Sequence, residues 1–312
     1  MKHGSIQVEV TDLPQASLRS IFGMYGKGST EEDRLLVSQI NLEKAPDWFC
    51  QSYDNFGHRA VQMTEWLKNN ILPPAQAEQY MKETAIHRAK WIRDNGTKGL
   101  TEIVSEYPCL LDTPGMISQD FSVLNSDCAS KLTENWVPVF KDKILRFARR
   151  EKQALHLLSD VDTMSADIQS DIALLVFPMV LPTSVHKIGR KMFRPRFIET
   201  RKAFIDIQPI GTNMAEYLRC AKNTTEFSYV LMLGDNNQCF QAFVVINGEA
   251  LEQNTLLAAV DVCCKAFYTL DVNFPKPCSP VWEFLQIVVY GLPGNESPAI
   301  RILRAYISHT SV

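Results

Sequence analysis

Apolar side chains recur at helical spacing through much of the chain before residue 180. The clearest case lies between residues 130 and 152, where every fourth position is apolar and basic side chains occupy positions between them. The apolar positions are Leu132, Trp136, Phe140, Ile144 and Ala148. Such a stripe is typical of an amphipathic helix packed on a core. The pattern therefore predicts a helix over this segment with Trp136 buried.

Three more helices are predicted in this part of the chain, over residues 75–94, 100–107 and 165–178. The first ends at Asn95-Gly96, which is a common helix C-terminus. Ahead of it stands Pro73-Pro74, and a proline pushes the residue before it toward an extended conformation. We therefore place a boundary at residue 74. Residues 1–74 show no regular period and are predicted to form an irregular, mixed segment.

The pattern changes after residue 224. Residues 227–233 and 239–246 are rich in aromatic and β-branched side chains and flank Gly-Asp-Asn-Asn, which predicts a β-hairpin. Two apolar helices are predicted to follow, over residues 255–270 and 280–290. The expected fold is mainly α with a smaller α+β C-terminal part, in which one β-hairpin is packed by helices. The expected domains are the segment 1–74, a helical domain 75–210 and an α+β domain 211–312.

Composition narrows the class of protein. The chain has 312 residues, of which 46% are hydrophobic, and this can supply real cores. The formal net charge of -3 gives no global attraction to nucleic acid or anionic lipid.

The longest apolar stretch, residues 172–181, contains a proline and is shorter than the ~20 residues that a membrane-spanning helix needs. The N-terminus lacks the apolar region of a secretory signal. We expect a soluble protein of the cytoplasm or nucleus that does not contact membranes.

Eight cysteines are scattered among apolar residues, and no C-x-x-C pair occurs. This spacing favours neither a disulfide framework nor a structural zinc site. We expect buried, reduced thiols, with no metal and no cofactor.

Residues 23–30 resemble a phosphate-binding loop, but the spacing departs from the G-x-x-x-x-G-K-[ST] motif. Ile21 occupies the position of the first glycine, and Gly28 separates Lys27 from the hydroxyl of Ser29. Because the motif works by wrapping backbone N–H groups around phosphates and placing a hydroxyl beside magnesium, these changes argue against nucleotide binding. We predict a turn before a helix.

Other catalytic motifs are equally incomplete. Residues 112–115 match the D-x-x-G motif of GTPases, but no N-K-x-D motif accompanies it, so a proline turn is the simplest interpretation. No G-x-S-x-G nucleophile elbow occurs. The sequence therefore indicates no catalytic residue.

The strongest local anomaly is the stretch 187–202, which holds seven basic side chains and a single acid, Glu199. Phe193, Phe197 and Phe204 lie within or just after it. Basic side chains can contact phosphates while aromatic rings stack on bases, as in proteins that bind single-stranded nucleic acid. The candidate anion-binding or nucleic-acid-binding residues are Lys187, Arg190, Lys191, Arg194 and Arg196.

A second interpretation of this stretch is favoured: the phenylalanines enter a core and the charges form a solvated rim. Pro195 disfavours helix at Arg194, so we expect a helix that starts near Pro195 and continues to Phe204. Residues 187–194 would then be an exposed basic lead-in.

Several ordered motifs resemble one family. They are His87–Gly96, Leu110–Phe121, Arg190–Pro195, Ala203–Asp206 with Gly211–Met214, and Pro280–Leu285. Over roughly residues 75–307 they resemble the C-terminal region of sterile alpha motif domain-containing protein 3-like proteins, a group with many members in fish. The first 70 residues do not show a sterile alpha motif, so the resemblance does not extend to the polymerising or adaptor role of that module. It implies no particular activity or catalytic residue.

We therefore expect a non-enzymatic intracellular protein-interaction or scaffold protein with a protein partner that the sequence does not identify. One alternative is a nucleic-acid-associated module that uses residues 187–202 and binds weakly. Another is a hydrolase whose site is assembled from residues far apart in the sequence. An exposed apolar patch favours the first, cations gathered on one face favour the second, and a pocket with convergent polar groups favours the third.

Overall fold

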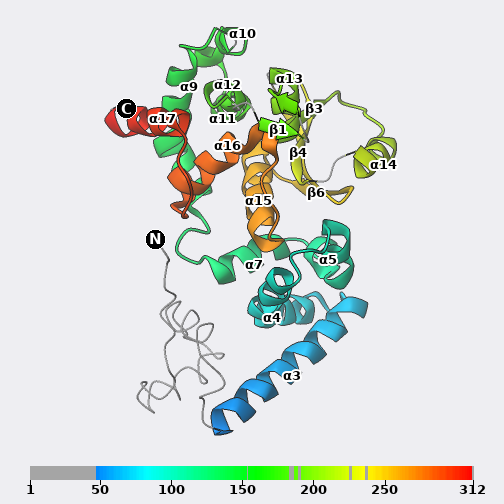
Figure 1. Ribbon diagram of the computed structural model, residues 1–312. Helices are drawn as coiled ribbons and strands as arrows, with labels where there is room; N and C mark the ends of the chain where they lie inside the picture. The colour runs from blue at the N-terminus through cyan, green and yellow to red at the C-terminus, as the bar shows by residue number, and fades with distance from the viewer. Residues whose placement is uncertain are drawn as a thin grey trace. The chain divides into compact units, whose positions relative to one another are not determined.

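A computed structural model of the protein divides into two compact units, residues 1–91 and 92–312 (Figure 1). The predicted loop at residues 23–30 lies outside the part of the chain that the structure describes. The described residues are 47–152, 154–182, 186–188, 191–224, 227–235 and 238–310.

Two helices make up the described part of the first unit, and the unit boundary falls near the end of the second. They are α3 (Asp47–Asn69) and α4 (Pro74–Asp94). The Trp66 ring contacts the Tyr80 ring edge-on at 5.1 Å, and Arg59 pairs with Glu83 at 3.1 Å. Because residues later in α3 meet residues earlier in α4, the two helices run antiparallel.

Helix α4 confirms the helix predicted over residues 75–94. Helix α3 is a correction, because it lies in the segment predicted to be irregular. Its buried residues Ala60, Met63 and Leu67 are three and four positions apart, which is a helical period. That period covers only two turns, so it does not stand out among the polar residues around it.

The predicted helix over residues 130–152 is a continuous helical run in three parts. These are α8 (Lys131–Asn135), the π-helix η3 (Trp136–Lys141) and α9 (Asp142–Ala148). All five residues of the apolar stripe are buried, and Trp136 is fully buried as predicted.

Short helices make up most of the described chain between α4 and residue 180. They are α5 (Leu100–Glu106), α6 (Cys109–Asp112), α7 (Met116–Leu124), α10 (Leu155–Leu158), the 3-10 helix η4 (Val161–Thr163), α11 (Ala166–Leu175) and α12 (Phe177–Val180). The turn predicted at residues 112–115 connects α6 to α7, and Gly115 there has a φ of 84°, a conformation that suits glycine. No helix among the described residues combines the length and the apolar character that crossing a membrane requires.

A four-stranded sheet follows, with the strand order β3-β4-β5-β6. The strands are β3 (Ile205–Gln208), β4 (Tyr229–Gly234), β5 (Cys239–Ile246) and β6 (Glu249–Gln253). β4 and β5 are antiparallel and confirm the predicted hairpin, and β6 is antiparallel to β5. β3 is parallel to β4, and helix α14 (Met214–Thr224) makes the crossover between them. The sheet is thus larger than the single hairpin expected from the sequence.

Helices cover both faces of the sheet (Figure 1). Alternate strand residues, including Leu231 and Val245, pack with Tyr217 and Leu218 of α14. The other face meets α15 (Leu256–Thr269), which lies against β4, β5 and β6. Strands β3 and β4 pair with each other, so the domain boundary predicted between residues 210 and 211 falls inside one sheet.

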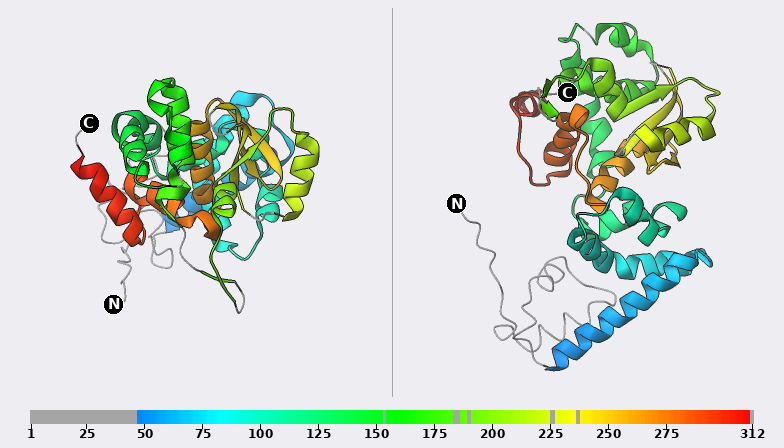
Figure 2. Two further views of the ribbon diagram at one scale, coloured as in Figure 1. Left: turned by 90° about the horizontal axis from the view of Figure 1, so that it is seen from above. Right: turned by 45° about the vertical axis from the view of Figure 1, so that its right-hand side comes forward.

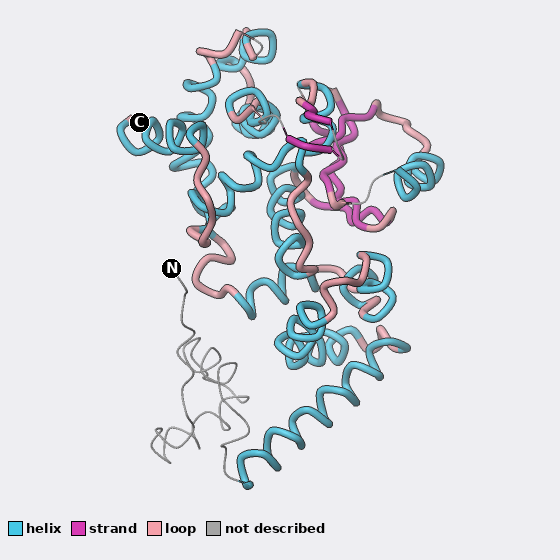
Figure 3. The backbone as a smooth tube through the Cα atoms, viewed as in Figure 1, coloured by secondary structure: helices cyan, strands magenta, loops and turns pink. Residues whose placement is uncertain are grey.

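After α15 the chain is helical again. It contains the 3-10 helix η5 (Lys276–Cys278), α16 (Ser279–Phe284), the π-helix η6 (Leu285–Tyr290) and α17 (Pro298–His309). These elements confirm the helices predicted over residues 255–270 and 280–290. As Figure 3 shows, strands occupy a small part of the described chain, so the prediction of a mainly α protein with a smaller α+β part is confirmed.

Candidate functional site

The basic stretch folds into two short strands followed by a helix. β1 (His186–Ile188) and β2 (Lys191–Phe193) are antiparallel, and α13 (Phe197–Phe204) starts two residues after Pro195. The predicted helix from Pro195 to Phe204 is therefore confirmed. The predicted lead-in turns out to contain a strand pair, which extends away from the helices around it in the left view of Figure 2.

The five predicted site residues fall into two groups. Arg194 and Arg196 lie between β2 and α13, and both are exposed. Lys187 lies in β1 and Lys191 in β2, on opposite strands of the pair. Arg190 lies outside the described residues, as do the side chains of Lys187 and Lys191.

The only acid of the stretch is used to start the helix. Glu199 accepts a 2.7 Å hydrogen bond from the backbone N–H of Arg196. A carboxylate in the first turn satisfies a backbone donor that has no partner within the helix and also suits the helix dipole. Glu199 therefore serves the local fold, and the surface beside it remains rich in cations.

The aromatic side chains of the stretch turn inward, as the favoured interpretation expects. Phe204 is fully buried and packs against Trp282 at 4.9 Å and Phe177 at 6.5 Å between ring centroids. Phe193 and Phe197 are partly buried. These rings therefore do not form the open platform on which successive bases stack.

Two aliphatic side chains take the exposed positions instead. Met192 is 69% exposed and Ile198 is 66% exposed. Ile198 and Lys202 are four residues apart on α13 and therefore share one face of the helix. We call the exposed side chains of Met192, Arg194, Arg196, Ile198 and Lys202 the basic–apolar surface.

An exposed cation from a distant part of the chain lies on a helix that packs against α13. Helix η5 packs against α13, and its first residue, Lys276, is exposed. Lys276 stands between Pro275 and Pro277, and sequence reasoning did not single it out. The sequence gives no signal for Lys276, because no other basic residue stands near it in the chain and its relation to α13 follows only from the packing of η5.

A buried polar network lies under the sheet edge next to α13. Asp206 of β3 accepts a 2.6 Å hydrogen bond from the Tyr217 hydroxyl, and the hydroxyl groups of Tyr217 and Tyr229 lie 3.0 Å apart. Burial raises the pKa of both tyrosines. The hydroxyl groups therefore stay protonated and serve as hydrogen-bond donors, which ties α14 to the sheet.

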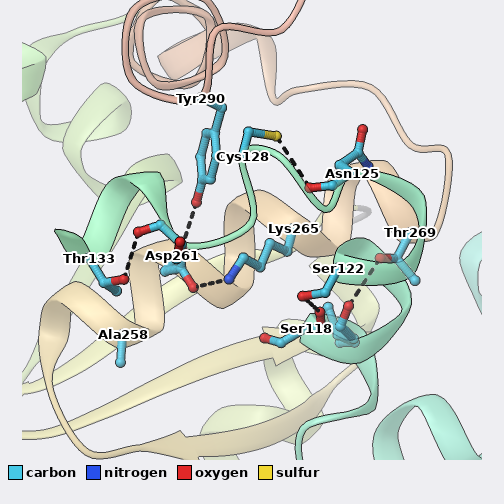
Figure 4. A network of polar contacts seen from close by, with 12 residues as sticks. Ser118, Ser122, Asn125, Cys128, Thr133, Ala258, Asp261, Lys265, Thr269 and Tyr290 are labelled. Atoms are coloured by element: carbon cyan, nitrogen blue, oxygen red, sulfur yellow. Dashed lines mark hydrogen bonds and ion pairs between the residues drawn. The ribbon is translucent and has the colours of Figure 1, made fainter. Parts of the chain in front are cut away.

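A second buried network joins α15 to the end of η6 (Figure 4). Asp261 pairs with Lys265 at 2.5 Å and accepts a 2.6 Å hydrogen bond from the Tyr290 hydroxyl. Burial raises the pKa of Tyr290 well above its usual value. The ammonium and the carboxylate satisfy each other, so this network stabilises helix packing and presents no group poised for proton transfer.

Among the described residues, burial raises the pKa of three carboxyl groups, those of Asp171, Glu249 and Glu283, and the change is largest for Asp171. The pKa of Asp171 on α11 is raised to about 6, because burial raises it more than a hydrogen bond from the Cys239 backbone lowers it, and the Asp167 carboxylate adds a smaller rise. Burial also raises the pKa of the Cys239 thiol to about 12. A protonated thiol is a poor nucleophile, so this pair does not resemble a thiol–acid catalytic site.

Metal and cysteine chemistry add no further candidate in the described part of the chain. No cluster of three or more histidine, cysteine, aspartate or glutamate side chains there could hold a metal ion. Cys263, Cys264 and Cys278 are free and fully buried, and burial raises the pKa of each thiol. The basic–apolar surface is therefore the best-supported candidate site.

No protein-family model, curated protein or solved structure matches this chain. The resemblance to the C-terminal region of sterile alpha motif domain-containing protein 3-like proteins stays a prediction.

Proposed function

We propose that this protein is a non-enzymatic interaction protein that binds a protein partner through the basic–apolar surface. The observation that carries the proposal is the exposure of Met192 and Ile198 beside Arg194 and Arg196. Methionine and arginine are enriched in protein–protein interfaces. Full burial of one large aliphatic side chain contributes about 1.5–3 kcal/mol, so a partner that covers both would gain appreciable affinity.

We place this interaction in the cytoplasm or nucleus. The buried free thiols of Cys263, Cys264 and Cys278 suit a reducing compartment.

Affinity capture from a cell extract treated with nuclease tests the proposal. The wild-type chain is compared with Ile198→Ser and with Ile302→Ser, because Ile302 lies on α17 and is exposed to a similar extent, 61%. We expect the captured protein to survive nuclease treatment, to be lost with Ile198→Ser and to be retained with Ile302→Ser. The proposal would be contradicted if nuclease treatment abolished the capture, or if neither substitution changed it.

Nucleic-acid binding is the second candidate, and the β1–β2 strand pair is the observation that favours it. A two-stranded ribbon can enter the major groove of DNA, and Lys187 and Lys191 lie on its two strands. Fluorescence anisotropy with labelled single- and double-stranded oligonucleotides at about 50 mM and about 200 mM salt tests this candidate. We expect at most weak binding that falls as salt rises. Tight binding at the higher salt concentration would favour nucleic acid over a protein partner.

A further inference from the structure

We infer that the partner presents an acidic amphipathic peptide segment, in which carboxylates alternate with apolar anchor residues at helical spacing. This inference rests on the proposed function and names the chemistry of the partner. It follows from the charge, the apolar exposure and the spacing of the basic–apolar surface.

Charge is the first argument. The whole chain carries a net charge of -3, yet this surface is cationic. Arg194, Arg196 and Lys202 are exposed on it, and Lys276 lies on the neighbouring helix η5. Glu199, the acid within the stretch, accepts a hydrogen bond from the backbone N–H of Arg196. Lys202 lies 3.8 Å from the buried Asp206 carboxylate, so the arginines carry most of the uncompensated charge. A partner with carboxylates would be complementary to this surface, whereas a basic partner would be repelled.

The exposed apolar side chains are the second argument. Phosphate groups can neutralise the arginines, but they offer nothing apolar to Met192 and Ile198. Bases could offer stacking, but Phe204 is fully buried in the core and the other two rings of the stretch are partly buried. A peptide supplies carboxylates and aliphatic side chains together, so the combination favours a peptide over nucleic acid.

Spacing is the third argument. Ile198 and Lys202 are one helical turn apart on the same face of α13, so their Cβ atoms are about 5–6 Å from each other. A partner helix with an apolar residue and a carboxylate three or four positions apart matches that distance. Helical amphipathic segments commonly bind in this way, with anchors at i, i+3 or i+4.

Three fluorescein-labelled peptides of equal length test the inference with the full chain. One combines glutamate and leucine in an amphipathic pattern, one replaces leucine by serine, and one replaces glutamate by lysine. We expect only the glutamate–leucine peptide to bind, with an affinity that falls as salt rises. Equal binding of the lysine–leucine peptide would overturn the inference.

Matched variants locate the binding. Replacing Arg194 and Arg196 by glutamine should lower the affinity for the glutamate–leucine peptide by about five- to thirtyfold. Replacing Lys82 and Lys90 by glutamine removes the same charge from the exposed side of α4 and should leave the affinity within about twofold. Ile198→Ser should weaken binding by about tenfold or more, and Ile302→Ser should not. Because these side chains are exposed, circular dichroism should show unchanged melting.

The outcomes separate the inference from the proposed function. In one outcome, cellular capture depends on Ile198 but the arginine substitutions do not lower the affinity for the glutamate–leucine peptide. The proposed function then stands, and the acidic-partner inference is overturned. If neither capture nor peptide binding depends on Ile198, both fail. A labelled DNA duplex that binds more tightly than the peptide and loses affinity with the arginine substitutions would assign the surface to nucleic acid and overturn the inference.

Discussion

The indole Nε1–H of Trp136 donates a 2.7 Å hydrogen bond to the Ser170 hydroxyl oxygen. Trp136 is fully buried, and this bond satisfies the one polar group of its ring. Its ring also packs on that of Phe177, with the centroids 5.8 Å apart. The π-helix η3 is thereby joined to α11 by a hydrogen bond and to α12 by an apolar contact.

Truncation of Trp136 should be strongly destabilising. We expect Trp136→Ala to lower the free energy of unfolding by about 3–5 kcal/mol, because it removes a large buried aromatic ring. Ser170→Ala should cost less, about 1–3 kcal/mol, because it leaves the indole N–H without its acceptor while the packing stays. Urea unfolding of both variants measures the difference. Equal midpoints for wild type and Trp136→Ala would show that the ring does not hold the core together.

The buried pair of Asp261 and Lys265 offers a test by double substitution. Lys265→Met should cost about 3–5 kcal/mol, because it leaves the Asp261 carboxylate buried without its counter-charge. Adding Asp261→Leu should recover part of this loss by removing that charge, although the Tyr290 hydroxyl then loses its acceptor. Unfolding in denaturant gives all three free energies. A double variant less stable than Lys265→Met would contradict this view of the pair.

Asp171 should make stability depend on pH. Its pKa is raised to about 6 in the folded protein, against roughly 3.9 for an unfolded chain. The folded state therefore binds the proton more tightly, and stability falls as pH rises through this window. Asp171→Asn keeps an oxygen that can accept from the Cys239 backbone but cannot ionise. We expect it to raise the melting temperature above pH 7 and to lose this advantage below about pH 4. A gain that is independent of pH would refute the assignment.

Substitutions at two glycines with positive φ should distinguish the stability cost of backbone strain from the cost of crowding. A Cβ at Gly248, where φ is 78°, would lie 2.7 Å from Cβ of Lys222. A Cβ at Gly115, where φ is 84°, would meet no atom of the described residues within 4 Å. We expect Gly115→Ala to cost about 1–2 kcal/mol from conformation alone, and Gly248→Ala to cost more because Lys222 must also move. Thermal melting compares them, and equal losses would argue against crowding at Gly248.

The sequence by itself determined the elements whose signal is local. The stripe around Trp136 predicted a buried helix face, and the composition on either side of Gly234 predicted the β4–β5 hairpin. Pro195 predicted where α13 begins. In each case the deciding interactions, a helical period, a turn or a missing backbone donor, lie within a few residues of one another.

Only the tertiary structure decided the features that depend on distant partners. Strand β3 is four residues long, and its parallel pairing with β4 needs the α14 crossover, so its sequence alone gives little strand signal. A stripe at every fourth position drifts by about 40° per step on an α-helix, because 3.6 residues make a turn. The wider π-helical turn of η3 offsets that drift and keeps the stripe facing the core.

The candidate site divides in the same way. The sequence supplied its cations at Arg194 and Arg196 and the expectation that the phenylalanines enter the core. The exposure of Met192 and Ile198 and the approach of Lys276 followed only from the packing of α13 against η5 and the core. The amphipathic period of an element shows which of its faces prefers burial. Which side chains remain exposed depends on the elements, distant in the sequence, that pack against it.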